Sequence, residues 1–542
     1  MSVSSKTAAS ASTRGLLLAD AQAGFLVFLI ALPLCLGISV ASGFPPIAGI
    51  MTAIIGGLIV SPLSGSALTI KGPAAGMIVI VLGAVTELGA GDPLAGYHRA
   101  LAVGVVAAIV QMALAALRTA RFGITLSRSV VHGMLAAIGI IIISKQIHVM
   151  VGVKPASKEI LGLIAEIPNS LIHANPLLAG IGLLSIAILV AWPKIRRGAF
   201  MNKIPAQLVV LIVVIPLAIL CDIPHAHPYH FFHHDYTVSA ANLVQLPASI
   251  LSGIAFPDFS MIMTMTSVKY IIMFALVGTI ESTLSVVAID GIDPKHRTSK
   301  LDKDLFALAV GNLISSLIGG LPMISEIVRS KANVDAGANS AKANAFHGLF
   351  LLVFVATLPS LLQLIPLAAL AAMLVFVGFR LASPNEFRHM YHIGADQLLL
   401  FLVTLVMTLA TDLLIGVGTG IALKIALHMM RGGRFGSLFR PVIHSEQVSN
   451  ETMRMVIHGA AAFPSLIHVK KALQSAPAHV RHVEIDAGDA VLVDHTFLSG
   501  LAGIFGERPQ ISYEVVGLEK FRAASHHPEA TRWRGRNMYV TA

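Results

Sequence analysis

Two short segments rich in glycine and proline, residues 69–76 and 319–326, hold the residues best suited to binding an anion. Each segment interrupts an apolar stretch. Proline suits the first position of a helix, so Pro73 and Pro322 predict two helices that start within apolar surroundings. The start of a helix offers free N–H groups and a partial charge of roughly +0.5. Two such starts facing each other predict a site for a compact anion.

The candidate substrate-binding residues lie in and just after the two breaks, where small side chains would let an anion reach the backbone. These candidates are Gly72, Pro73, Ala74, Ala75, Met323, Ile324, Ser325 and Arg329. Glycine and proline also kink ordinary membrane helices, which is the alternative interpretation of each break. Two breaks at matching positions in the two halves of the chain favour a transporter built from inverted repeats.

Two ionisable residues within apolar segments are further candidates, because such residues usually face a cavity, pair with a partner or line an ion path. Glu281 is predicted to bind a coupling ion, either a proton or sodium. Its alternative role is a structural ion pair with a basic side chain such as Arg329 or Lys71. Arg329 either attracts the anion or holds its own helix by pairing with Glu326, three residues before it.

The composition is that of an integral membrane protein. Hydrophobic residues make up 55% of the 542 residues and charged residues only 12%, about half the charged share of a soluble protein. Apolar stretches long enough to span a bilayer recur through the first four-fifths of the chain. They predict an all-α polytopic fold of about fourteen segments, centred near Pro33, Ala53, Val79, Ala107, Gly139, Ser185, Leu211, Val277, Leu308, Ile327, Leu351, Leu370, Thr404 and Ile421.

The positive charge follows membrane topology rather than a binding face. The net charge is +10, and Lys and Arg gather in the loops that even-numbered segments reach, which the positive-inside rule places in the cytoplasm. No nucleic-acid partner is therefore predicted.

The topology and the membrane follow from the same charge distribution. Both termini, including a tail at residues 1–19, are expected in the cytoplasm, and the protein is expected in a lipid bilayer of the bacterial inner (plasma) membrane type. Cys35 and Cys221 lie in separate apolar segments and predict neither a disulfide nor a metal site.

A change in composition after residue 440 predicts a second domain. The expected elements alternate: a strand at 453–458, a helix at 464–475, a strand at 480–486, a helix at 497–505 and a strand at 512–517. Such alternation is typical of a small α/β domain, here at residues 451–525 and in the cytoplasm. The transmembrane domain takes residues 20–435, with repeats at about 20–221 and 266–435.

The order and spacing of several motifs resemble the sulfate permease (SulP) family of anion transporters. The motifs are residues 32–34, 39–46, 70–73, 281–285 and 325–330. The tail, at residues 483–486 and 493–496, is similar to the STAS domain that closes many members. The resemblance implies fourteen helices in two inverted seven-helix repeats, divided into core and gate domains, with the anion between the third and tenth helices.

The resemblance also implies a function and partners. Family substrates are sulfate, bicarbonate, chloride and small dicarboxylates, and uptake is often coupled to protons or sodium. The eighth helix contributes to the cation site in this family, which adds Ser285, one turn beyond Glu281. The resemblance further implies a homodimer and a tail that binds a cytoplasmic partner. No cofactor or metal is expected apart from the coupling ion.

Three residues depart from the pattern of the family. Lys71 stands just before the first break, where members often have a neutral residue, so it either adds positive charge to the site or extends away from it. Glu326 replaces a small hydroxyl residue, and its pairing with Arg329 would partly cancel the charge of the arginine. His495 follows Asp494 where a phosphorylatable Ser or Thr often lies, which argues against a phosphorylation switch there.

An outside loop is dense in histidine and has the composition of a metal-binding or pH-sensing tract. Its residues are His225, His227, His230, His233, His234 and Asp235. Their spacing matches no defined metal site, so a solvated loop is the favoured interpretation.

The leading functional hypothesis is secondary active uptake of a small inorganic anion, of the sulfate or bicarbonate class, by alternating access. Two alternatives stay open: a proton-coupled nucleobase carrier of the same inverted-repeat plan, and a membrane-anchored scaffold or signalling protein. An enzyme is not expected, because the chain carries no zinc triad, nucleophile elbow or phosphate loop.

Overall fold

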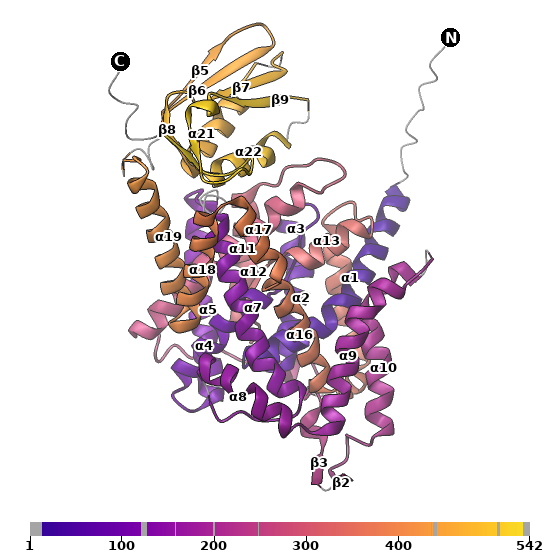
Figure 1. Cartoon of the computed structure of the whole chain (residues 1–542). Helices are drawn as coiled ribbons and strands as arrows, with labels where there is room; N and C mark the ends of the chain where they lie inside the picture. Colours follow the sequence, from indigo (N-terminus) through magenta and orange to yellow (C-terminus); the bar gives the residue numbers. More distant parts are fainter. Residues whose placement is uncertain are drawn as a thin grey trace. The chain divides into compact units, whose positions relative to one another are not determined.

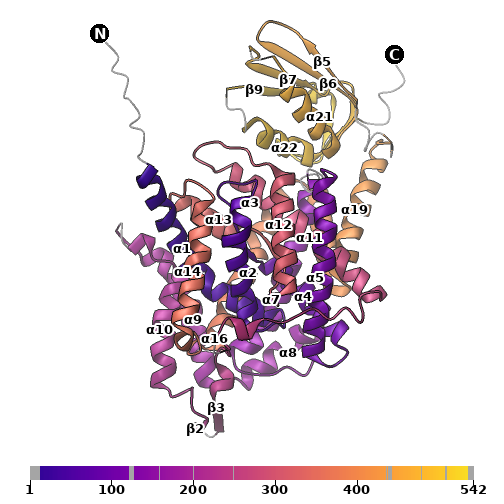
Figure 2. The same cartoon turned by 180° about the vertical axis from the view of Figure 1, so that it is seen from behind.

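The computed structural model describes residues 13–120, 127–157, 159–198, 201–232, 234–247, 249–434, 436, 442–477, 479–506 and 510–534. Residues 1–12 of the predicted tail and His233 of the histidine-rich loop lie outside the described residues. The chain forms helices up to residue 430 and a smaller domain with most of the strands after residue 441 (Figures 1 and 2).

The helices before residue 431 are α1 (Thr13–Ala41), α2 (Pro46–Ile55), α3 (Ser61–Leu63), α4 (Ile78–Gly89), α5 (Pro93–Ala116), α7 (Arg128–Met150), α8 (Ile160–Ile172), α9 (Pro176–Ile195), α10 (Ala206–Leu220), α11 (Met265–Asp290), α12 (Leu301–Leu317), α13 (Ile327–Asp335), α14 (Lys342–Thr357), α15 (Pro359–Leu362), α16 (Leu367–Leu381), α17 (Pro384–Ile393), α18 (Ala395–Ala410) and α19 (Leu413–Met430). Each of the fourteen predicted centres lies in one of them. Within the described residues, eight helical segments are long and apolar enough to cross a membrane, and shorter apolar helices accompany them. The all-α polytopic prediction is therefore confirmed. Helix α8 was not predicted, because Glu166 and Pro168 interrupt its apolar pattern.

The chain divides into two compact units. The first comprises residues 1–117, 176–294 and 299–373, and the second comprises residues 118–175, 295–298 and 374–542. The second unit thus joins α7, α8 and the last helices to the C-terminal domain. The predicted boundaries at residues 435 and 451 follow a change in composition rather than this division, and they stay predictions.

Close helix packing in the first unit depends on glycine. Helix α1 packs along α14, and α5 packs along α12 and α4. A side chain at Gly24 would collide with the backbone of Ala343 and His347, so glycine there lets α1 and α14 approach closely. The same holds for Gly57, whose missing side chain admits the backbone of Gly348 on α14.

The C-terminal domain is a sheet covered by helices on one face. Its strands are β5 (Val442–Gln447), β6 (Thr452–Ala461), β7 (His482–Asp486), β8 (Ala490–Val493), β9 (Ser512–Val516), β10 (Arg522–Ala523) and β11 (Arg532–Trp533), and its helices are α21 (Phe463–Gln474) and α22 (His495–Gly506). The strand order is β10-β11-β8-β6-β7-β9, with β5 also paired to β6. Alternate residues such as Met455 and Ile485 are buried against Val469 and Phe497 of the two helices. The predicted α/β character is confirmed, while β5, β8, β10 and β11 were not predicted.

A buried ion pair joins this domain to the last helix of the second unit. Asp494, which precedes α22, is fully buried, and its Oδ2 lies 2.8 Å from Nζ of Lys424 on α19. His428, one turn further along α19, lies 3.3 Å from Oδ1. Burial alone would raise the pKa of Asp494, but Lys424 and His428 hold it well below its usual range. Lys424 also donates a hydrogen bond of 2.8 Å to the Thr496 hydroxyl.

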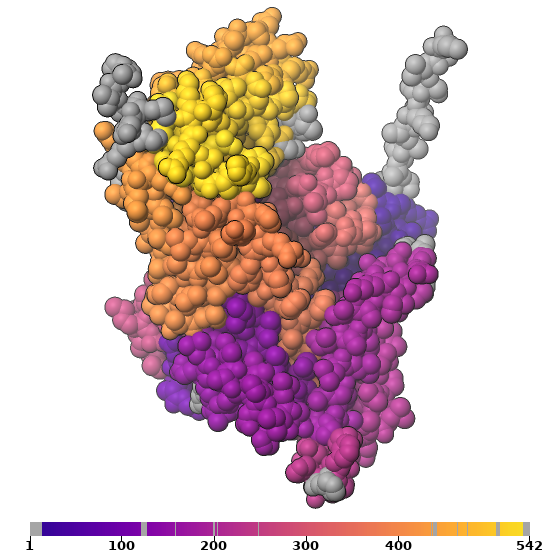
Figure 3. Space-filling view, viewed as in Figure 1, coloured from indigo at the N-terminus to yellow at the C-terminus, as the bar shows by residue number. Residues whose placement is uncertain are grey.

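The histidine-rich loop forms a two-stranded hairpin of β2 (His227–Phe231) and β3 (His234–Val238). Figure 3 shows this hairpin protruding from the surface. His230 lies opposite Asp235 in the register, and the hydrogen bond between them raises the pKa of His230. No group of three metal-ligating atoms gathers in this loop among the residues that the structure describes. The loop is exposed, as the favoured interpretation requires.

Candidate anion-binding site

The two predicted breaks meet as a pair of antiparallel strands. Strand β1 (Ile70–Pro73) pairs with β4 (Met323–Glu326), so that Lys71 lies opposite Ser325 and Gly72 opposite Ile324. The backbones of residues 70–73 and 323–326 thereby pair with each other as strands. The pairing brings segments about 250 residues apart into contact, as for Pro73 and Met323.

The helices start later than the prolines predict. Pro73 is the last residue of β1, and after Ala74 in extended conformation a 3₁₀ turn (Ala75–Met77) leads into α4. Pro322 precedes β4, and α13 starts only at Ile327. The prediction that Pro73 and Pro322 open the helices is therefore wrong, because α4 and α13 each start five residues after the proline. The physical reason is that each segment first pairs with the other as a strand.

The start of α4 lies against the Glu281 carboxylate of α11. A side chain at Gly76 would collide with both carboxylate oxygens of Glu281, so glycine is needed for this approach. Glu281 is 7% exposed, and its Oε1 has no hydrogen-bond partner among the described residues. Ser285, one turn along α11, is also buried. A buried carboxylate oxygen without a partner beside the start of a helix is an arrangement that a ligand would complete.

Strand β4 is held by an asparagine of α12. The Asn312 side chain accepts a hydrogen bond of 2.6 Å from the Met323 N–H and donates one of 3.2 Å to the Met323 carbonyl. It also donates to Gln111 of α5 at 2.9 Å. Just before β4, the carbonyl of Leu321 accepts a hydrogen bond from Ser315. These bonds position the second break from neighbouring helices.

Lys71 is neutralised by an acidic residue of α12. Its Nζ lies 2.5 Å from Asp304 Oδ2 and donates to the Ser325 hydroxyl at 2.6 Å. Lys71 is fully buried and Asp304 nearly so. The side chain therefore neither extends away from the site nor brings an unpaired charge to it, and it is not the partner of Glu281.

Arg329 braces the first break from α13. Its Nη2 donates to the Pro73 carbonyl, its Nη1 lies 3.5 Å from the sulfur of Cys35, and its guanidinium rests against Gly72. The predicted pair with Glu326 is present, with 3.5 Å between Nη2 and Oε1. These contacts hold Arg329 against the first break and offset its charge with that of Glu326. They also leave Glu281 without the structural ion pair that was its alternative role.

All the predicted site residues gather around the paired strands, because the eight substrate-binding candidates lie on β1, on β4 or within three residues of them. Sequence reasoning missed Asp304, Asn312 and Gln111. An acidic residue in an apolar helix is the signal that could have found Asp304. Asn312 and Gln111 carried no such signal, because buried amides are common between helices.

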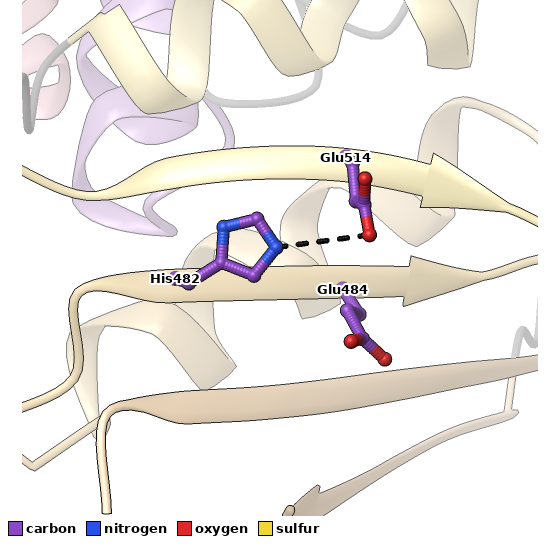
Figure 4. Close-up of side chains that lie close together, drawn as sticks. All are labelled: His482, Glu484 and Glu514. Carbon is purple, nitrogen blue, oxygen red and sulfur yellow. Dashed lines mark ion pairs between the residues drawn. The ribbon is translucent and has the colours of Figure 1, made fainter. Parts of the chain in front are cut away.

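A metal-like cluster lies elsewhere, on the outer face of the C-terminal sheet. Figure 4 shows His482, Glu484 and Glu514 on β7 and β9, with an ion pair of 3.8 Å between His482 and Glu514. Arg454 of β6 already binds Glu484 at 2.9 Å. The cluster is therefore a row of cross-strand ion pairs on a solvated face.

A model of the sulfate permease family matches residues 17–404 of the chain. The chain belongs to the sulfate permease family. One relative is YvdB of Bacillus subtilis, a candidate sulfate transporter that is 24% identical over 418 residues, covering 76% of this chain and 73% of YvdB. Another is the bicarbonate transporter BicA of Picosynechococcus, 24% identical over 404 residues, covering 74% of this chain and 68% of BicA.

Two solved structures share the fold. The transmembrane domain of a cyanobacterial bicarbonate transporter, BicA, superposes with a TM-score of 0.62 at 23% identity, covering 74% of this chain and 97% of that domain. The murine Slc26a9 anion transporter in its inward-facing state gives a TM-score of 0.65 at 15% identity, covering 92% of this chain and 85% of that protein. The predicted fold class is confirmed. Because members of the family transport anions, this chain is an integral membrane anion transporter and not an enzyme.

Proposed function

We propose that this transporter carries an anion of the sulfate or bicarbonate class by secondary active transport with alternating access. The observation that carries the proposal is the antiparallel pairing of β1 with β4, because the chain leaves this short strand pair at its two opposite ends, toward α4 and toward α13. The N–H groups there suit a compact oxyanion. The names of YvdB and BicA support the two substrate candidates, and the family match favours both over a nucleobase.

Glu281 is our candidate ligand for the coupling ion, with Ser285 beside it. The support for this role is that the Glu281 carboxylate is buried and that its Oε1 has no hydrogen-bond partner among the described residues. The carboxylate also lies against Gly76, just before α4. A proton or sodium ion bound there would offset the negative charge of the anion, so that each favours binding of the other.

The surroundings of the protein are part of the same proposal. The C-terminal domain is STAS-like and lies in the cytoplasm with both termini, and the chain works as a homodimer in a bacterial-type inner membrane. The distribution of Lys and Arg among the loops supports this orientation. The sheet and helices of residues 442–534 support a domain able to bind a cytoplasmic partner.

The test is uptake of labelled sulfate and, separately, of bicarbonate into proteoliposomes under an imposed sodium or proton gradient. Uptake of one anion driven by one gradient is expected. Failure of both anions with correctly inserted protein would contradict the proposal. Removal of the residues after 440 distinguishes the transporter from the scaffold alternative. A truncated protein that still transports the anion would exclude a membrane part that serves only to anchor the C-terminal domain.

A further inference from the structure

We propose that Glu326 is a tethered counter-ion, which holds the anion-binding groups of the empty transporter and is displaced when the substrate arrives. This inference rests on the proposed function, because it assigns a residue to anion binding at the same site.

The position of Glu326 places its carboxylate between the two helix starts. It is the last residue of β4 and directly precedes α13, and its side chain is only 14% exposed. Its Oε1 lies 3.5 Å from Nη2 of Arg329. The carboxylate also lies near the backbone N–H of Ala75, at the start of the turn into α4. One carboxylate therefore pairs with the cation that an anion would use and lies near a backbone donor at the start of α4.

The charges around the paired strands show why the anion must compete with Glu326. Two basic side chains, Lys71 and Arg329, lie at the strands. Asp304 neutralises Lys71, and Glu326 is the carboxylate paired with Arg329 among the described residues. No full positive charge in this part of the chain is left for a substrate. An anion gains the Arg329 charge only by replacing Glu326, since two like charges on one donor set repel strongly in buried surroundings.

Glu281 gives an independent sign that a ligand binds here. Its unpartnered Oε1 is buried and faces the same turn, against Gly76. With Glu326 in place, the start of α4 thus faces two carboxylates and no substrate. Binding is then an exchange of counter-ions in which the substrate takes the contacts of Glu326, and the return of Glu326 expels it.

The exchange predicts that affinity and turnover change in opposite directions in Glu326→Gln. This variant keeps the size of the side chain and removes the competing charge. Its Kd for the transported anion should fall about tenfold, and its maximal exchange rate should fall as well, because nothing expels the anion. If Glu326 only braced Arg329, the variant would bind the anion equally or more weakly.

The experiment measures binding and exchange of sulfate and of bicarbonate by the full-length protein. Glu326→Asp keeps the charge but withdraws it from Ala75, so a smaller fall in Kd is expected, and this variant carries the test if Glu326→Gln does not fold. Glu87→Gln is the matched control, since Glu87 lies on α4 but is half-exposed and paired with Lys269; its Kd should not change. An unchanged or raised Kd in the folded Glu326 variants would overturn the inference. A wild-type protein that neither binds nor transports either anion would instead overturn the proposed function.

Discussion

Lys71 and Asp304 form a buried ion pair. Two variants separate the contribution of this pair to stability from the cost of leaving one buried charge without its partner. Lys71→Met should lower the free energy of unfolding by about 3–5 kcal/mol, because it leaves the Asp304 carboxylate buried without its cation. Among the described residues, Asp304 would keep only its hydrogen bonds from Ser64, Ser66 and Ser325. Thermal unfolding in detergent measures the change.

The double variant Lys71→Met/Asp304→Leu is the control for this pair. Replacing both charges with apolar groups of similar size removes the unpaired charge, so much of the lost stability should return. A single Lys71→Met variant as stable as the wild type would show that the pair is not formed.

Glu281 should decide whether an ion gradient drives uptake. Glu281→Gln keeps the shape of the side chain and removes its charge, so the gradient should lose its effect on uptake while exchange of anion for anion persists. Uptake into proteoliposomes with and without the gradient distinguishes the two activities, and Glu87→Gln is the control. Gradient-driven uptake at the wild-type rate by Glu281→Gln would exclude Glu281 as the ligand.

At the scale of elements, an amide of α12 anchors the first residue of strand β4. Asn312→Ala would leave the buried N–H of Met323 without its acceptor, at a cost of about 1–3 kcal/mol. Because β4 pairs with β1, the loss should also weaken anion binding. Melting temperature and Kd measured together check this, against Thr86→Ala, whose hydroxyl bonds only within its own helix. A variant that loses stability but keeps its Kd would separate β4 from the site.

The elements were predictable to the extent that composition determines them. Apolar length located the fourteen segments, since a bilayer requires it, and the two Gly/Pro breaks located the segments that pair as β1 and β4. The positions of the helix starts were not predictable from Pro73 and Pro322. They depend on the pairing of β1 with β4, a contact between distant segments that no local preference encodes. The partner of Lys71 was hidden for the same reason.

At the scale of the whole molecule, Asp494 links the C-terminal domain to α19. Asp494→Asn should lower stability by about 3–5 kcal/mol at neutral pH, because Lys424 loses its buried partner. The folded pKa of Asp494 lies below its unfolded value of about 3.9. The contribution of the ionised Asp494 to the free energy of unfolding is therefore fully present above the unfolded pKa. It is lost as the pH falls from there through the lower folded pKa.

The difference in melting temperature between Asp494→Asn and the wild type should accordingly narrow below about pH 4. Asp489→Asn is the control, because Asp489 is exposed and pairs loosely with His458, so its effect should stay below about 1 kcal/mol. A difference for Asp494→Asn that does not change with pH would refute the ionic link.

Binding of the anion by backbone N–H groups at the start of α4 is the central claim, and Ala75→Pro tests it most directly. Proline removes one donor, and it suits both the first turn of a helix and the extended conformation of Ala74 before it. We therefore expect a folded protein whose Kd for the transported anion rises about tenfold or more, as for a hydrogen bond to a charged group. A folded Ala75→Pro protein with the wild-type Kd would contradict the account.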